Sequence, residues 1–580
     1  MSSGRSRRFL HLSLGFWSGA TRVRAWLLTI AALVFLVANL AAALAVNLWN
    51  KFFFDALEQK DTRTVLFSIG LALILAMFSG ACFVGGLHAR MRLQVRWRQW
   101  LTRTLINRWL ADRHFYQLSI LATEADNPEA RIAEDGRLAI ELLVDLSLGV
   151  LNALLAALSF ISILWVVGGS LTVAGYTIPG YMVFACIFYS AITSVGMFLL
   201  GRPLVRRVEE KSAGEAQLRY ELTRVKENAE IIALMGGDDH ERARLDVTLS
   251  DLVHRWLRVI SWQGRMNWLI GSNLILATTV PLLLGAPKYL ADEMTLGSLM
   301  QAATAFMQVQ VALNWLSDNA LRLADWFSSS HRVTQLTDAI DRLEESLGHL
   351  SQTGTIRLAV SPDDRVHLRD LKIALRDGDL MIDGAEAAIS PGEKVLIKAE
   401  GGTDKSAFIH AVAGLWPWGS GEILRPQGAN IAFMSQRPYL PLGTLRNALL
   451  YPELGYEVSE ESIRDALTRC GLRHLVPRLD DTDRWTSLLS SSEQQRFAFA
   501  RALIHPPDIL IMDEPTSALD ELSQFKLMEY MRDLLPDTMV IHAGHGIGLE
   551  QFHDRELVLV RSYREVPSAR GAAPSDKLKR

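Results

Sequence analysis

The segment Ala399–Ser406, AEGGTDKS, decides the fold of this chain. An intact phosphate-binding loop reads G-x-x-x-x-G-K-[ST]. Its backbone N–H groups surround the phosphates, its Lys reaches the β and γ oxygens, and its hydroxyl binds Mg²⁺. Lys405 and Ser406 match this pattern, whereas Ala399 and Asp404 replace its two glycines. Because Asp404 adds a carboxylate where the backbone must approach a polyanion, we expect weakened nucleotide binding.

Alone, the octet is more consistent with an ordinary polar turn between a strand and a helix, so the downstream residues decide the matter. Residues 509–512, ILIM, predict a buried strand that ends at Asp513 and Glu514. Asp513 would hold Mg²⁺ through water, and Glu514 would orient or deprotonate the attacking water.

Three further segments extend the pattern. LSSSEQQR, residues 489–496, can begin a helix whose N–H groups and serine hydroxyl face phosphate. Gln436 follows the apolar run 431–434, and His545 follows the run 539–541. Each piece has a simple structural explanation, as a helix cap, a surface amide or a buried histidine, but their order and spacing argue against coincidence.

Together these motifs resemble the nucleotide-binding domain of ABC transporters. The resemblance identifies AEGGTDKS as Walker A, LSSSE as the signature, residues 513–514 as Walker B, residues 517–520 as the D-loop, Gln436 as the Q-loop and His545 as the switch histidine. It implies an α/β P-loop NTPase domain at residues 355–561 that uses ATP and Mg²⁺. In this family two such domains pair head to tail, so that each signature closes over the partner's ATP.

The resemblance also implies the roles of individual residues. The catalytic residues are Glu514, His545 and Gln436. The nucleotide-binding residues are Ala399, Glu400, Gly401, Gly402, Thr403, Asp404, Lys405, Ser406 and Ala407 in the loop, with Ser490, Ser492 and Glu493 in the signature. The metal ligands are Ser406, Gln436 and Asp513.

Several positions depart from the family pattern. Besides the two loop glycines, Ser492 lies where the signature usually has Gly, and Gly546 replaces the Arg or Lys that often follows the switch histidine. An adenine-stacking aromatic is not evident between residues 370 and 384. Because Lys405 and Glu514 are present, we predict residual ATP binding and slow hydrolysis.

The composition indicates a membrane protein. The chain has 580 residues, of which 49% are hydrophobic, and the apolar residues are concentrated before residue 316. The formal net charge of −3 gives no indication of a nucleic-acid partner. Cys82, Cys186 and Cys470 lie far apart and offer neither a disulfide framework nor metal-ligand spacing.

Six stretches are apolar enough to cross a bilayer, which needs about 20 helical residues. They are residues 25–46, 64–87, 146–169, 181–200, 268–284 and 296–316. Arginines cluster before the first, after the second and after the fourth stretch, which predicts that both termini and the ATP domain are cytoplasmic. We expect a helical transmembrane domain at residues 1–345, a linker at 346–354 and a disordered basic tail at 562–580.

Polar side chains recur on one face of the sixth stretch: Gln301, Thr304 and Gln308, with Gln310 and Asn314 nearby. We hypothesise that they line a transport path, and helix–helix hydrogen bonding is the alternative. Asp145, at the edge of the third stretch, is either a proton or substrate site or an interfacial residue. The long charged segments between spans predict cytoplasmic helical extensions whose bends touch the ATP domains.

Several strings narrow the resemblance, among them DNPEARIAED (126–135), GLWPWGSG (414–421) and PLGTLRNALLYP (441–452). They resemble the bacterial SbmA/BacA-like ABC transporters, which have an exporter-type fold but include importers of antimicrobial peptides, bleomycin and cobalamin. This group is similar to the peroxisomal acyl-CoA half-transporters. The resemblance implies six spans fused to one ATP domain in each chain.

The hypothesis is an ATP-driven transporter of peptides or bulky amphipathic solutes in a bacterial inner membrane, in contact with membrane lipid and working as a homodimer. A heterodimer with an intact half-transporter remains open. One alternative is an ion-gradient-driven or regulatory membrane protein with a vestigial ATP domain, and another is an acyl-CoA or fatty-acid transporter.

Overall fold

The computed structural model describes residues 2–120, 127–173, 176–353, 356–374, 380–399, 405–416, 418–452, 458–544 and 548–559. The chain divides into two compact units, Met1–Asp341 and Arg342–Arg580. The first unit is helical and the second is α/β, in agreement with the predicted fold class.

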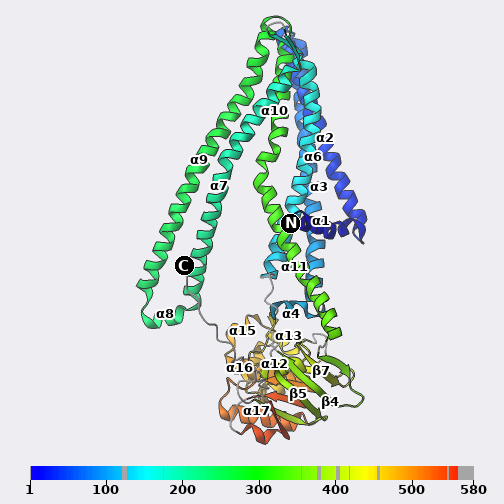
Figure 1. Cartoon of the computed structure of the whole chain (residues 1–580), viewed down its shortest axis with the longest axis vertical. Coiled ribbons are helices and arrows are strands. Elements are labelled where there is room, and N and C mark those ends of the chain that lie inside the picture. Colours follow the sequence, from blue (N-terminus) through cyan, green and yellow to red (C-terminus); the bar gives the residue numbers. More distant parts are fainter. Residues whose placement is uncertain are drawn as a thin grey trace, which may run out of the picture. The chain divides into compact units, whose positions relative to one another are not determined.

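Long helices dominate the first unit (Figure 1). Its elements are α1 Ser2–Ser18, α2 Arg22–Glu58, α3 Thr62–Leu110, α4 His114–Ile120, α5 Pro128–Ala130, α6 Gly136–Gly168, α7 Tyr181–Glu227, α8 Ala229–Met235, α9 Asp238–Leu290, α10 Leu296–Asp318 and α11 Ala320–Thr353, with a hairpin of β1 Ser170–Val173 and β2 Tyr176–Pro179. Helix α10 packs against α2 and α6, while α7 and α9 pack along each other and α8 joins their ends. Helix α11 continues through residues 346–353 of the expected linker.

Five helical segments of the described chain are long and apolar enough to span a membrane. They are α2, α3 with its continuation to Ser119, residues 128–168 including α6, α7 and α9. The sixth predicted stretch forms helix α10 of 23 residues, but its glutamines make it less apolar. Five of the six predicted spans are therefore confirmed by length and composition, and the crossing by α10 stays a prediction.

Three of these helices exceed the thickness of a bilayer. Helices α3, α7 and α9 have 49, 47 and 53 residues. At 1.5 Å per residue each is about 70–80 Å long, against a hydrocarbon core of about 30 Å. Each helix must therefore continue well outside the membrane, as the charged segments predicted.

The polar face of α10 is used in packing between helices. Asn47 on α2 donates to Thr304 Oγ1 at 2.7 Å, and Gln310 donates to Asn273 on α9 at 2.8 Å. Ser194 on α7 donates to Asn314 at 3.0 Å. For Thr304, Gln310 and Asn314 the structure therefore favours helix–helix hydrogen bonding over a path-lining stripe, whereas Gln308 is exposed.

The start of α10 is fixed by carboxylates at the end of α2. Leu296 N donates to Glu58 at 2.9 Å and Gly297 N donates to Asp55 at 3.0 Å. The first N–H groups of a helix have no intrahelical partner, and negative charge is favourable there. A Cβ on Gly297 would lie 2.2 Å from the backbone oxygen of Lys51, so a glycine is required for this close approach.

We predict that Gly297→Ala destabilises the membrane unit by about 1–3 kcal/mol, the usual cost of overpacking against backbone. The melting temperature of the purified protein in detergent measures this loss. Gly70→Ala on α3 is the matched control, because a Cβ there meets nothing within 4 Å. Equal melting temperatures for the two variants would contradict the prediction.

The second unit contains a five-stranded parallel sheet in the order β13-β6-β12-β11-β8. Its strands are β6 Lys394–Ala399, β8 Ile431–Met434, β11 Ile509–Asp513, β12 Met539–Ala543 and β13 Arg555–Leu559. Helices α12 Lys405–Val412, α13 Leu445–Leu450, α14 Glu460–Arg469, α15 Trp485–Leu488, α16 Ser491–Ile504 and α17 Glu521–Leu534 belong to the same unit. Residues 509–512 are buried, which confirms the predicted strand.

A second sheet has the order β3-β7-β4-β5, formed by β3 Arg357–Val360, β4 Val366–Ala374, β5 Leu380–Ile389 and β7 Gly419–Arg425. A short pair, β9 Gly443–Thr444 and β10 Thr482–Asp483, completes the strands of the described residues. Apolar cores lie on both faces of the parallel sheet, with Phe408 of α12 in one and Phe497 of α16 in the other. Because the five strands are parallel, their carboxyl ends share one edge of the sheet, where ligands bind in such folds.

Candidate active site

The AEGGTDKS segment joins a parallel strand to a helix. Ala399 is the last residue of β6 and Lys405 the first of α12. This is the context that a phosphate-binding loop requires. The connecting residues Glu400, Gly401, Gly402, Thr403 and Asp404 lie outside the described residues, as does His545.

The end of the AEGGTDKS segment and the residues at the end of β11 come together at the carboxyl edge of the parallel sheet. Ser406 Oγ donates to Asp513 Oδ2 at 3.1 Å, and Lys405 Nζ lies 3.7 Å from Glu514 Oε1. The Lys405 side chain is 11% exposed and that of Glu514 is 33% exposed. A hydroxyl, two carboxylates and an ammonium from segments over 100 residues apart thus form one cluster, with Ala407 buried behind them.

The environment of Asp513 suits a hard cation. Burial raises the pKa of Asp513 above its usual range, while the hydrogen bond from Ser406 and the charges of His410 and Lys405 act in the opposite direction. Mg²⁺ prefers oxygen ligands, with one or two carboxylates and several waters. The adjacent oxygens of Ser406 and Asp513 fit that preference, and a bound cation would favour the charged carboxylate.

Glu514 has a strained backbone. Its φ of 47° lies in the left-handed region, which side chains other than Gly adopt at a cost of about 1–3 kcal/mol. Its N–H donates to Ala543 O at 2.8 Å, so the end of β12 holds it in place. Such strain is typical of functional positions and here turns the carboxylate toward Lys405.

The signature segment forms the start of α16. Ser490 caps the helix by accepting from Glu493 N, and Glu493 in turn accepts from Ser490 N at 2.9 Å. The N–H of Ser490 is the main reason that the pKa of Glu493 lies below its usual value. Ser492, in the first turn, is partly exposed. Within one chain, Ser490 and Glu493 therefore act as a capping box.

Gln495 was not predicted from the sequence, yet it links three of the motifs. It is 1% exposed, and its Nε2 donates to Gln436 O at 3.0 Å and to Ser517 Oγ at 3.1 Å. Its Oε1 accepts from Ala518 N at 2.9 Å. The signal that could have revealed it is a polar residue one turn before Phe499 on the buried face of α16. The side chain of Gln436 is exposed, and only its backbone is held by this contact.

A pair of histidines, the buried His542 and the half-buried His553, supports the end of β12. His553 Nδ1 lies 2.7 Å from Leu549 O, so this nitrogen carries the proton and donates to the carbonyl. Its Nε2 must then accept from His542 Nδ1, 3.1 Å away. Burial is the main reason that the pKa of His542 falls to about 3, and the imidazole stays neutral.

This burial makes the stability of the second unit depend on pH. An unfolded histidine binds a proton near pH 6.5, whereas folded His542 does so only near pH 3. Between these values the unfolded chain holds more protons, so the unfolding free energy falls by about 1.4 kcal/mol per pH unit as pH decreases. We predict that His542→Leu loses less melting temperature between pH 7.5 and 5.5 than the wild type, measured by scanning calorimetry.

The control for this measurement is His240→Leu on the exposed start of α9, which should keep the wild-type profile. A His542→Leu profile as steep as that of the wild type would show that this histidine does not control the pH dependence.

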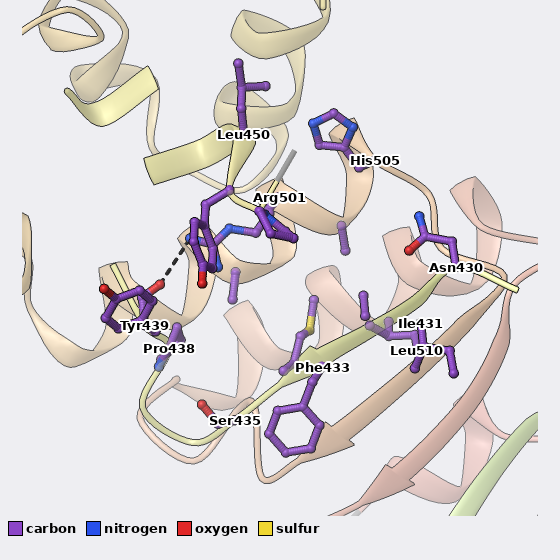
Figure 2. Close-up of a pocket in the computed structure, with 16 residues that line it drawn as sticks. Asn430, Ile431, Phe433, Ser435, Pro438, Tyr439, Leu450, Arg501, His505 and Leu510 are labelled. Atoms are coloured by element: carbon purple, nitrogen blue, oxygen red, sulfur yellow. Dashed lines mark hydrogen bonds between the residues drawn. The ribbon is translucent and has the colours of Figure 1, made fainter. Parts of the chain in front are cut away.

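A pocket of about 310 Å³ lies beside β8, the edge strand of the parallel sheet (Figure 2). Its walls are β8, the end of α13 and one face of α16, with Phe433, Tyr439 and Tyr451 as aromatic lining. Arg501 projects from α16 and donates to Tyr439 O and Ala448 O. Among the described residues no carboxylate pairs with Arg501, and burial lowers its pKa.

Comparison with known proteins agrees with this geometry. A family model described as "ABC transporter transmembrane region 2" matches residues 16–290, and one described as "ABC transporter" matches residues 382–517. The chain is 30% identical to the inner membrane ABC transporter ATP-binding protein YddA of Escherichia coli, covering 94% of this chain and 96% of that protein.

More distant relatives occur in eukaryotes. The chain is 26% identical to the human lysosomal cobalamin transporter ABCD4, over 80% of each protein. It is also similar to a solved structure of a bacterial Atm1-family ABC exporter with ATP bound, with a TM-score of 0.66, 18% identity, and coverage of 92% of this chain and 94% of that one. This last likeness concerns the fold.

Proposed function

The chain belongs to the ABC transporter family, and we propose that it carries peptides or other bulky amphipathic solutes across a bacterial inner membrane as a dimer. It is a half-transporter, a multi-span membrane domain fused to an ATPase domain that is coupled to transport. The position of YddA in the inner membrane supports the proposed location. We propose that both termini are cytosolic because of the distribution of arginines between the spans.

The observation that carries the proposal is the cluster of Lys405, Ser406, Asp513 and Glu514 in the same chain as five membrane-length helices. In the proposed site, Ser406, Asp513 and Gln436 hold Mg²⁺, and Lys405 contacts the phosphates. Glu514 orients the attacking water, and His545 contacts the terminal phosphate.

The remaining nucleotide contacts come from the loop residues 399–407 and from the signature residues Ser490, Ser492 and Glu493. Because one chain has one loop and one signature, a second chain must supply the signature that completes each site. A homodimer is the simplest assembly, and a heterodimer with an intact half-transporter would also complete the site. ATP-driven closure then alternates access to the solute through its different affinity for the two states.

The cargo is proposed on the basis of the relatives. The human relative named a cobalamin transporter supports a bulky amphipathic solute as the cargo class. An acyl-CoA or fatty acid remains a second candidate, because relatives also include D-family members from Arabidopsis thaliana and Mus musculus.

We predict that Asp404→Gly raises ATP turnover of the purified, lipid-reconstituted protein about tenfold, or ~1.4 kcal/mol, by removing a carboxylate from the phosphate loop. Glu514→Gln should lower turnover at least ~100-fold, as expected for the loss of a general base. Phosphate release measures both rates.

Uptake into proteoliposomes decides between this function and its main alternative. Uptake that requires ATP and is lost in Glu514→Gln supports the proposal. Uptake that continues with a proton gradient and no ATP would replace it with an ion-gradient-driven protein whose ATP domain is a vestige.

We also propose that the pocket beside β8 receives a helical cytoplasmic bend and transmits motion to the membrane helices. Aromatic residues at the centre of such interfaces contribute more than about 1 kcal/mol each. Tyr451→Ala should therefore reduce solute moved per ATP about fivefold or more, while ATP turnover is kept. Leu522→Ala, exposed on α17 outside the pocket, is the control. A proportional loss of transport and turnover in Tyr451→Ala would contradict this role.

A further inference from the structure

A cavity in the membrane unit lies between α2, α3 and α6. It has a volume of about 240 Å³ and an apolar body formed by residues such as Phe35, Phe83 and Leu148. Its polar lining consists of Asn39, Arg90, Asp145 and Asn152. These positions lie within or at the edge of the apolar segments of the three helices.

The amides in this cavity differ from other polar groups of the bundle. Asn47, Gln310 and Asn314 are hydrogen-bonded to neighbouring helices. By contrast, the side chains of Asn39 and Asn152 make no hydrogen bond to any residue that the structure describes. Polar side chains in membrane segments either pair with each other or line a path or cavity for a polar ligand. Asn39 is half-buried and Asn152 is exposed in this chain, so both amides are available to a polar group in the cavity.

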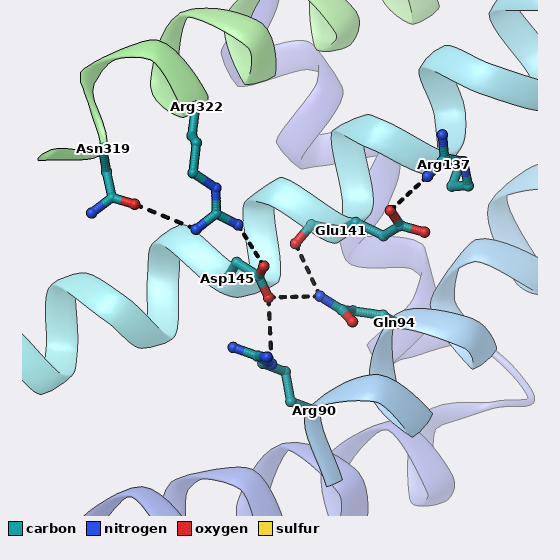
Figure 3. A network of polar contacts seen from close by, with 7 residues as sticks. All are labelled: Arg90, Gln94, Arg137, Glu141, Asp145, Asn319 and Arg322. Carbon is teal, nitrogen blue, oxygen red and sulfur yellow. Dashed lines mark hydrogen bonds and ion pairs between the residues drawn. The ribbon is translucent and has the colours of Figure 1, made fainter. Parts of the chain in front are cut away.

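One end of the cavity carries a network of charges centred on Asp145 (Figure 3). Gln94 donates to Asp145 Oδ1 at 2.7 Å, and Arg322 donates to Oδ2 at 2.6 Å. Arg90 Nε lies 3.5 Å from Oδ1, an ion pair without hydrogen-bond geometry. Asp145, which the sequence left open as a proton or substrate site, thus accepts hydrogen bonds from two side chains and forms an ion pair with a third.

The network has a surplus of positive charge. Two guanidinium groups, Arg90 and Arg322, face the single carboxylate of Asp145, and the nearby pair of Arg137 and Glu141 is neutral. Arg322 forms the shorter contact with Asp145, so the positive charge that remains uncompensated is that of Arg90. Its Nε is buried without a hydrogen-bond partner among the described residues. The Arg90 side chain is nevertheless 39% exposed, so an acidic group on a ligand can reach the outer part of the guanidinium in a charge-assisted contact.

We propose that this cavity binds an amphipathic carboxylic acid, with its apolar body between α2, α3 and α6, its carboxylate at Arg90 and its polar groups at Asn39 and Asn152. The inference rests on the proposed transport function and narrows its solute to acids. The C-terminal carboxylate of an apolar peptide and that of a fatty acid share this chemistry.

The test is binding of tritiated N-acetyl-trileucine and of decanoate to the full-length protein in nanodiscs of zwitterionic lipid, by equilibrium dialysis against empty nanodiscs. We expect saturable binding of at least one acid. Its uncharged counterpart, N-acetyl-trileucine amide or decanol, should bind at least about tenfold more weakly, because a charge-assisted hydrogen bond is lost. Binding of the peptide acid alone assigns the site to peptides, binding of decanoate alone assigns it to acyl chains, and mutual competition assigns it to both.

Variants locate the site within the protein. Arg90→Gln should weaken binding about tenfold or more and Arg90→Lys less, since Lys keeps the charge. Asn39→Leu and Asn152→Leu leave the ion network intact and should each weaken binding severalfold. Arg96→Gln, on the same helix and in contact with Gln99, should bind as the wild type does.

Equal binding of acid and uncharged counterpart, unchanged binding in Arg90→Gln together with both Asn variants, or no saturable binding of either acid would overturn the proposal. All these measurements omit ATP, so their failure leaves ATP-driven transport unaffected. Conversely, a protein that binds the acid through Arg90 but transports nothing with ATP would remove the proposed function and keep the site.

Discussion

The parallel register of β6, β12 and β11 is the constraint on which the ATP-binding half of the molecule depends. Asp513 lies opposite Ala543, and Ala543 lies opposite Ile397, two residues before the phosphate loop begins. This alignment brings Ser406 and Asp513 within hydrogen-bonding distance. It also lets Ala543 hold the strained backbone of Glu514. A shift of one residue in β11 would turn the Asp513 side chain to the opposite face of the sheet, away from Ser406.

The membrane half depends on a different constraint, the need to satisfy polar groups where water is absent. Helix α10 meets it by bonding to α2, α7 and α9 through Thr304, Asn314 and Gln310. At the more exposed start of α10, the carboxylates of α2 accept from the first N–H groups of the helix. These polar side chains of the spans thus hold helices together, whereas Asn39 and Asn152 line the proposed ligand cavity.

Sequence patterns predicted the elements of this protein better than its side-chain partners. The buried strand 509–513 and the strand–helix context of Lys405 follow from apolar runs and from motif order, which are local properties. The role of Gln495 could not be read in this way, because it depends on Gln436 and Ser517 meeting in space. The polar stripe of α10 shows the same limit. Its period placed it on one face, but only the neighbouring helices determined whether that face met a path or other side chains.

Both the phosphate loop and the signature segment carry a negatively charged residue where a negatively charged triphosphate is proposed to bind. By its place in the sequence next to Lys405, Asp404 brings a further negative charge to the proposed phosphate loop, where Glu514 already lies 3.7 Å from the Lys405 ammonium. The burial that raises the pKa of Asp513 shows how costly negative charge is there without a cation. The signature offers a helix N-terminus, yet its first turn carries Glu493, whose charged form is stabilised by the cap. In the proposed site, a metal ion would therefore supply much of the positive charge that a triphosphate needs, and its concentration would govern ATP affinity more strongly than in a site with an intact glycine loop.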